Sequence, residues 1–283
     1  MILIKNILFS LFFVFTLLGP TWSQNLLDYS NSLKYADYLF KTNQYNLATV
    51  EFERIVYLEP NDTLSKLKLI RSYRYLTEYQ TALNRIEMFF PYRLKNLPEE
   101  FSNEYVINMF HENQFQKATA FLQTIENMDI GVRTDYQLGL LILQNQWTEA
   151  SSFVDEHLEV LDKSKRFIGL NNIVLKGLNT NYKSPILAAS ISAVVPGGGK
   201  VYSGRWKDAI YSFLFVTTSS WFTYKSYQNN GFSINSVLLG SFALSFYSAD
   251  IYGSVQSAKK FNQKKNLSFR SQAENILFND QKR

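Results

Sequence analysis

The chain has 283 residues, 46% of them hydrophobic, a formal net charge of +5, no cysteine and two histidines. The absence of cysteine excludes disulfides, thiolate zinc sites and cysteine nucleophiles. His111 and His157 lie in separate helical-looking segments. Because metal ligands usually come in sets of three or four, we expect no metal site and no cofactor.

The first residues have the pattern of a secretory signal peptide. Lys5 is followed by an apolar run over residues 7–18, a Gly-Pro pair and two small residues, the second of which is Ser23. A basic start, an apolar core of about 7–15 residues and small residues before the cut are typical of exported proteins. We expect a signal peptide over 1–23, with an uncleaved anchor as the alternative.

A four-residue pattern, aromatic-x-x-Ala, occurs four times at spacings of 34, 36 and 32 residues. Each copy follows a polar turn and precedes an apolar residue four positions after the alanine. Residues four apart lie on one helix face, where the small alanine lets a neighbouring helix approach closely. The four pairs are Tyr45 and Ala48, Tyr79 and Ala82, Phe115 and Ala118, and Trp147 and Ala150.

This pattern resembles the tetratricopeptide repeat, a helix–turn–helix unit of about 34 residues. The first unit matches best, with Ala36, Ala48 and Phe52 at positions that the family prefers, whereas Ile70 in the second unit stands where the family has a small residue. The resemblance covers about residues 29–165 and implies an all-α solenoid of three to five units, with four the best count. A non-repeating helical bundle is the alternative, because periodic alanines and aromatics are also ordinary core residues.

The resemblance implies a binding function for a domain over residues 24–178. Stacked repeats curve and present a concave surface to extended peptides or partner helices. We expect a protein or peptide partner there and no enzymatic activity, because no Ser-His-Asp order, metal cluster or pair of catalytic carboxylates emerges. The candidates on the first helices are Asn31, Lys34, Tyr35, Asp37, Tyr38, Arg71, Arg74 and Asn108.

Residues 179–262 have the composition of a membrane domain. Two runs, 209–224 and 233–249, contain no charged residue. They are near the lower length limit for a membrane span, and the flanking Tyr and Trp extend them into the interface. We expect two membrane helices, and a third if the shorter apolar segment 185–199 also crosses.

The stretch PGGGKV, residues 196–201, raises a choice between a phosphate-binding loop and a turn in a membrane domain. A phosphate-binding loop requires Gly-x-x-x-x-Gly-Lys-Ser/Thr, but Val194 stands five before Gly199 and Val201 follows Lys200. We therefore expect the glycines to serve backbone conformation and close helix approach.

The same stretch resembles the turn of a two-helix bacterial membrane family with a PGxGxxYxG pattern, a family without established chemistry. The resemblance covers residues 184–262. Its turn residues in this chain are Pro196, Gly197, Gly199, Tyr202, Gly204 and Asp208.

Basic residues flank both uncharged runs, and the loop between the runs, QNNGFS, is neutral. By the positive-inside tendency, both basic flanks belong in the cytoplasm. If the repeats are exported, residues 185–199 must then cross as a third span; otherwise the hairpin is inverted. We expect a bacterial inner-membrane protein with a periplasmic repeat domain. Residues 263–283 are expected to form a basic, polar tail that contacts lipid headgroups rather than nucleic acid.

Asp250 follows the second run and is the intramembrane acid of the chain. Such acids are costly in lipid and often functional, although a hydrogen bond to Tyr202 or Ser212 would make Asp250 structural. The sequence predicts a membrane-anchored adaptor that binds protein partners during envelope assembly and that can self-associate through its membrane domain. The alternative is a small transporter or channel element with a periplasmic regulatory repeat domain.

Overall fold

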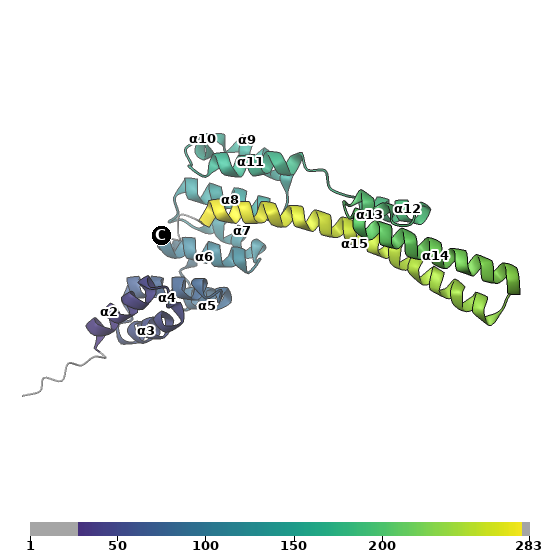
Figure 1. Cartoon of the computed structure of the whole chain (residues 1–283). Coiled ribbons are helices and arrows are strands. Elements are labelled where there is room, and N and C mark those ends of the chain that lie inside the picture. The colour runs from purple at the N-terminus through teal and green to yellow at the C-terminus, as the bar shows by residue number, and fades with distance from the viewer. Residues whose placement is uncertain (1–27, 279–283) are drawn as a thin grey trace, which may run out of the picture. The chain divides into compact units, whose positions relative to one another are not determined.

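The computed structural model describes residues 28–278, and Figure 1 shows helices joined by turns throughout this part. Over these residues there is no β-strand, so the expected all-α class is confirmed for them. The signal peptide expected over 1–23 lies outside the described residues. The chain divides into two compact units: the first holds the residues up to Gln114 with Ile125–Asn127, and the second holds Phe115–Thr124 and the chain from Met128 onward.

The first unit is a stack of short helices that pack in chain order. Each α-helix packs against the next, and α4 also contacts α2 and α6. The first helices of three successive pairs, α2, α4 and α6, therefore lie in a row. The elements are α2 (Tyr29–Lys41), α3 (Tyr45–Leu58), α4 (Thr63–Tyr75), α5 (Tyr79–Phe89), a 3-10 turn (Leu94–Asn96) and α6 (Glu99–His111).

The second unit begins with further short helices and ends with two long ones. The short helices are α7 (Phe115–Thr124), α8 (Ile130–Leu143), α9 (Trp147–Glu156), α10 (Leu158–Leu161), α11 (Phe167–Leu178), α12 (Pro185–Val194) and α13 (Gly198–Tyr202). The long helices, α14 (Trp206–Asn230) and α15 (Ile234–Phe278), pack side by side as a hairpin over the first half of α15 (Figure 1).

One turn geometry recurs at all four aromatic-x-x-Ala positions. The aromatic residue begins α3, α5, α7 or α9, and the residue two positions before it has a positive φ. The residue between them donates its backbone N–H over 2.9 Å to the carbonyl five positions back, a closure typical of helix C-termini. The residues with positive φ are Asn43 (60°), Thr77 (62°), Asn113 (56°) and Asn145 (58°). The repeat seen in the sequence is therefore also a repeat of backbone geometry.

An aspartate sets the first residue of three of these helices. The carboxylates of Asp28, Asp62 and Asp129 accept the backbone N–H three residues on, at 2.8, 3.0 and 3.0 Å, and so cap α2, α4 and α8. A cap of this kind contributes about 0.5–2 kcal/mol, because it satisfies an otherwise unpaired backbone donor.

Helix α15 continues past the expected boundary at residue 262. The helix runs without a break to Phe278, so the described part of the expected tail, 263–278, is the continuation of the second long helix. Phe269, Ala273 and Leu277 are buried on one face, at a four-residue spacing that places them together. This face packs against α8 and α11, and the Phe269 ring lies 5.1 Å from the Trp147 ring.

Residues 185–199 do not extend far enough for the expected third crossing. Ten helical residues measure about 15 Å, half of the roughly 30 Å of a bilayer core. The segment also returns to where it started: the Asn262 side chain accepts the Lys183 N–H at 2.8 Å and donates to the Lys183 carbonyl at 2.9 Å, while the Ser184 N–H donates to the Tyr202 hydroxyl at 3.1 Å. We call residues 185–202 the re-entrant element.

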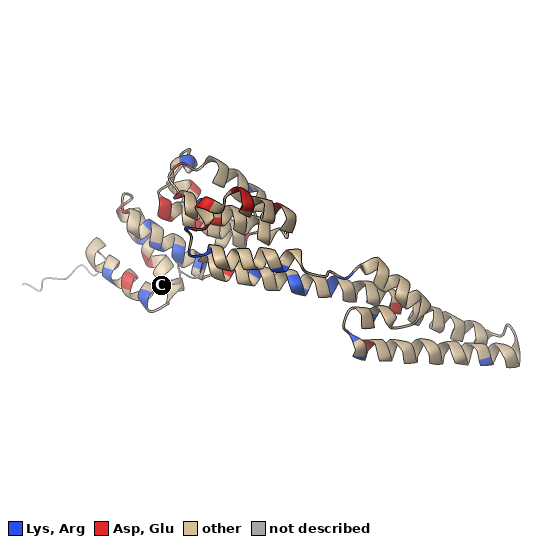
Figure 2. Ribbon diagram, turned by 90° about the horizontal axis from the view of Figure 1, so that it is seen from above, with Lys and Arg blue, Asp and Glu red and all other residues tan. Residues whose placement is uncertain are grey.

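Large apolar side chains cover the outside of the long hairpin. Among the described helices, α15 alone is both long and apolar enough to cross a membrane, and 11% of its apolar window is buried. Figure 2 shows few charged residues along α14 and the first half of α15. The exposed side chains include Phe213, Leu214, Phe215, Trp221, Phe222, Val237, Leu238, Phe242 and Leu244, whereas the buried ones are mostly small, as at Ala209, Ser236, Ser254, Ser257 and Ala258.

Candidate functional site

The Pro-Gly-rich turn is held in place by backbone approaches that only glycine permits. Pro196 lies in the turn between α12 and α13, and Gly197 follows with a φ of +84°. A Cβ on Gly197 would lie 2.4 Å from the Ala209 carbonyl oxygen, and one on Gly199 would lie 2.0 Å from the Ala188 carbonyl oxygen. These glycines therefore serve conformation and close packing.

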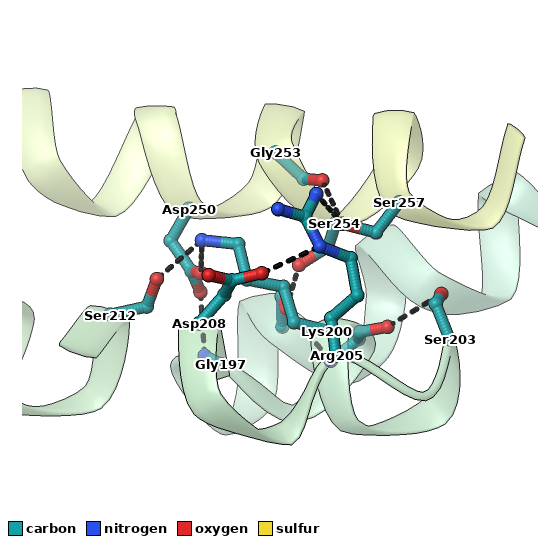
Figure 3. A network of polar contacts seen from close by, with 12 residues as sticks. Gly197, Lys200, Ser203, Arg205, Asp208, Ser212, Asp250, Gly253, Ser254 and Ser257 are labelled. Carbon is teal, nitrogen blue, oxygen red and sulfur yellow. Dashed lines mark hydrogen bonds and ion pairs between the residues drawn. The ribbon is translucent and has the colours of Figure 1, made fainter. Parts of the chain in front are cut away.

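Asp250 lies at the centre of this turn, where its side chain is almost fully buried. Its Oδ2 accepts the Gly197 backbone N–H at 2.7 Å, and its Oδ1 faces the Lys200 Nζ at 2.9 Å as an ion pair (Figure 3). The Lys200 ammonium also donates to the Ser212 hydroxyl on α14. Lys200 therefore points into the protein and pairs with a carboxylate. A lysine that binds phosphate would have to point out of the protein and leave its ammonium group without a carboxylate partner.

Serine hydroxyls extend the network along α12, α13 and α15. Ser192 and Ser254 are hydrogen-bonded at 2.7 Å, and the Gly199 N–H donates to the Ser192 hydroxyl at 2.9 Å. Ser203, buried at the end of α13, donates to the Gly199 carbonyl at 2.9 Å. The backbone N–H groups of Gly197 and Gly199 thus each bond to a side chain of another helix, Asp250 on α15 and Ser192 on α12.

The outer edge of the network holds a second ion pair. Arg205 and Asp208 are 2.6 Å apart, with side chains 45% and 44% exposed. Arg205 also donates to Ser257 on α15 at 3.2 Å. Because this pair is half exposed, its contribution to stability is small, typically about 0–1 kcal/mol.

The structure places every residue of the expected membrane turn around this network, with two changes from expectation. Asp250 bonds to Gly197 and Lys200, where Tyr202 or Ser212 was expected, and Tyr202 instead receives the Ser184 N–H. Gly204 has a φ of +80° but open space around it, so its role is conformational.

Sequence reasoning missed two parts of the network. Lys200 was considered for phosphate binding and as a basic flank of the first uncharged run but not as the partner of Asp250, and Ser192 and Ser254 were not singled out. The signal for α15 is the run of small residues Gly253, Ser254, Ser257 and Ala258, whose spacing of three to four brings helices into close contact.

The repeat-packing residues lie inside the two units. Ala36 and the alanines of all four repeats, Ala48, Ala82, Ala118 and Ala150, have no exposed surface, and neither has Phe52. Their neighbours Tyr45 and Trp147 pack ring against ring: Tyr45 stacks on Tyr75 at 4.4 Å, and Trp147 meets Phe269 edge-on. Tyr79 stacks on His111 at 4.5 Å. Phe115 begins α7, where Arg270 lies 5.9 Å above its ring.

Several side chains expected on the binding surface are used internally. Asp37 pairs with Lys68 at 2.6 Å, and Arg71 and Arg74 both pair with the buried Glu104 of α6, at 2.9 and 2.7 Å. Arg74 and Asn108 are themselves buried, which corrects the expectation that they are exposed. Tyr35 and Tyr38 are exposed on α2, with 50% and 58% of their surfaces accessible, and Lys34 on the same helix is exposed as well.

The network can hold two helices and a broken turn together. It offers no metal site: among the residues that the structure describes, no group of three or more His, Asp or Glu side chains converges. Comparison with known proteins gives no match, whether to a family model, to a curated protein or to a solved structure. The two family resemblances therefore rest on the sequence motifs alone.

Proposed function

We propose that this chain is a membrane-anchored helical-repeat adaptor that binds a protein partner through its repeats. The observation that carries the proposal is how side chains are distributed between the outside and the inside of the hairpin of α14 and α15. Large apolar side chains face outward and small or hydroxyl side chains face inward, the arrangement that membrane helices use to pack in lipid. A soluble core helix would bury its large residues.

The same hairpin defines the topology of the proposal. The re-entrant element begins and ends beside Asn262, and the last part of α15 packs on the repeat helices α8 and α11. Two spans with one re-entrant element therefore keep α8 to α11, Lys183 and the lysine-rich part of α15 on one side of the membrane. The signal-peptide pattern places that side outside the cytoplasm, and the loop at Gly231 inside.

For this topology, two sequence rules predict opposite sides of the membrane. The positive-inside tendency favours a cytoplasmic location for the lysine-rich part of α15, whereas the signal-peptide pattern favours export of the repeats. Because the lysine-rich part of α15 packs on the repeat helices, both lie on one side of the membrane, and only one of the two rules can hold. We propose that export prevails, since long domains translocate largely regardless of charge.

The proposed partner surface is on α2, the first helix of the row formed by α2, α4 and α6. Tyr35 and Tyr38 lie three positions apart on this helix, both about half exposed, beside internally neutralised charges such as Asp37. Exposed tyrosines supply large contact area at low conformational cost and often dominate protein interfaces. The proposed partner is a protein or a peptide.

Photo-crosslinking tests this surface with a matched control. A photoreactive phenylalanine at Tyr38 is expected to yield one discrete adduct in cells, and the Tyr35→Ala/Tyr38→Ala variant is expected to lose co-purification of the same protein. Tyr57, on α3, is 84% exposed and serves as the control position. Equal adducts at Tyr57 and Tyr38, or a double variant that retains its partner, would refute the α2 surface.

A small transporter or channel element is the second candidate, because a buried carboxylate–ammonium pair lies within the hairpin. Against it, Asp250 is already engaged by Gly197 and Lys200. If Asp250 carries ions or protons, Asp250→Asn abolishes ion flux into vesicles that contain the protein. The adaptor is favoured if the wild-type protein shows no flux, or if the variant shows the same flux as wild type.

A further inference from the structure

The second unit contains an open, basic groove beside the re-entrant element. It has a volume of about 670 Å³ and lies between the turn that precedes α14 and the middle of α15. Three lysines, Lys260, Lys264 and Lys265, and one arginine, Arg205, line it together with serine hydroxyls at 203, 257 and 268. Figure 2 marks the Lys and Arg positions along this part of α15 in blue on the ribbon.

The lysines of the groove lack carboxylate partners. Across the residues described, 28–278, no ion pair involves Lys260, Lys264 or Lys265, and the one arginine of the groove is neutralised by Asp208. Residues 179–278 contain ten Lys and Arg against three Asp and Glu, a net charge of +7. The groove thus concentrates positive charge that the protein itself leaves uncompensated.

Two features place the groove at the edge of the proposed membrane domain. Trp206 begins α14 directly after Arg205, and its side chain is 58% exposed. Tryptophans are enriched where membrane helices reach the headgroups. One turn further into the hairpin, exposed apolar side chains such as Ile210 begin. A ligand in the groove could therefore place an anionic group beside the lysines and an acyl chain along α14.

We infer that this groove binds a phosphate group, supplied by the headgroup of an anionic phospholipid. Lysine ammonium groups bind phosphate as point charges, the exposed Ser268 hydroxyl can donate to one of its oxygens, and basic pockets beside membrane helices bind acidic headgroups. The inference rests on the proposed membrane anchoring. It goes beyond that proposal by naming a lipid class and the side chains that select it.

Lipid titration of the full chain in uncharged detergent tests the site. Short-chain phosphatidylglycerol, short-chain phosphatidylcholine and inorganic phosphate are titrated separately, with tryptophan fluorescence as the readout. Phosphatidylglycerol is expected to bind at least tenfold more tightly than phosphatidylcholine. Each lysine near an anionic surface contributes roughly fivefold, so Lys260→Gln/Lys264→Gln/Lys265→Gln is expected to lose on the order of a hundredfold in affinity at low salt.

The matched control neutralises the same number of lysines elsewhere in this unit: Lys163→Gln/Lys165→Gln/Lys176→Gln is expected to bind as wild type does. Saturation by inorganic phosphate without lipid would support the phosphate site while assigning a free anion as its ligand. Equal binding of the two lipids, or equal losses in both triple variants, would overturn the site. Because the hairpin topology is measured independently by thiol labelling, failure of this site remains distinguishable from failure of the membrane proposal.

Discussion

Asp250 and Lys200 form a buried ion pair, 2.9 Å between Oδ1 and Nζ, that joins the long helix α15 to the five-residue helix after the glycine turn. The carboxylate also accepts the Gly197 N–H, so one side chain neutralises a lysine and fixes the turn. The pair closes the re-entrant element onto the hairpin.

Removing one member of this pair should destabilise the protein more than removing both. Asp250→Asn and Lys200→Gln each leave a buried group without its counter-charge, at a cost of about 3–5 kcal/mol, whereas the double variant recovers much of that loss. Chemical unfolding of the full chain in uncharged detergent gives the coupling between the two changes. Arg205→Gln, in the half-exposed pair, serves as the control, with an expected loss of no more than about 1 kcal/mol. Additive single losses would show that the pair is not coupled.

Gly199 should not tolerate a methyl group. In Gly199→Ala the new Cβ would lie 2.0 Å from the Ala188 carbonyl oxygen and 2.7 Å from the Ser254 Cβ, so helix α13 would have to move away from α12 and α15. We expect a loss of several kcal/mol, at the high end of overpacking effects. Gly240→Ala is the control, because its nearest neighbour, the Thr223 Cγ2, is 3.5 Å away. Equal unfolding midpoints for the two variants would contradict the close approach.

The repeat turn around Thr77 offers a stabilising change. Thr77 has a φ of 62°, a conformation that β-branched residues rarely adopt and that asparagine tolerates better. The other three turns have asparagine at this position. Thr77→Asn is expected to slow amide hydrogen exchange in α4 and α5 by roughly two- to fivefold, equivalent to about 0.5–1 kcal/mol. Thr77→Val keeps the β-branch and should not slow amide hydrogen exchange. Slower exchange in both variants would contradict the explanation from backbone conformation.

Asp135 should make the second unit less stable as the pH rises. Burial raises the pKa of its carboxyl, despite the 2.6 Å hydrogen bond from Ser164 and the nearby Arg166. Because the folded pKa lies above the unfolded value, the folded state binds the proton more tightly. Stability is highest below the unfolded pKa, near pH 4, and falls as the pH rises through the raised pKa.

Asp135→Asn removes this penalty and can still accept the Ser164 hydroxyl. The variant is expected to match wild type near pH 3.5 and to be the more stable protein at pH 7, as measured by unfolding between these values. A variant curve that falls as steeply as the wild-type curve would rule out Asp135 as the titrating group.

The sequence was sufficient to predict those features that repeat or that follow from composition. The all-α class follows from helical periodicity, and the four aromatic-x-x-Ala motifs mark where α3, α5, α7 and α9 begin. The conformational role of Gly197 and Gly199 followed from the failure of the phosphate-loop spacing. These inferences depend on residues close together in the chain.

What the sequence did not predict depends on contacts between distant residues. Glu104 binds two arginines of α4 that lie 33 and 30 positions earlier, and no local pattern identifies it. Lys183 and Asn262 are 79 positions apart, yet two hydrogen bonds join the start of the re-entrant element to the middle of α15. The continuation of α15 beyond residue 262 was not predicted, because lysines and polar residues hide the four-residue spacing of Phe269, Ala273 and Leu277.

Thiol labelling is the most direct test of the central claim, that two spans and a re-entrant element keep the repeat helices and the lysine-rich part of α15 on one side. Single cysteines at Ser152, Asn181, Asn230 and Gln263 can be compared without background, because the chain has no native cysteine, and all four positions are exposed. In intact cells, an impermeant thiol reagent is expected to label Ser152, Asn181 and Gln263, and to reach Asn230 only after lysis. Labelling of Ser152 with protection of Gln263 would contradict the account, since α15 would then end on the opposite side from the helices that it packs against.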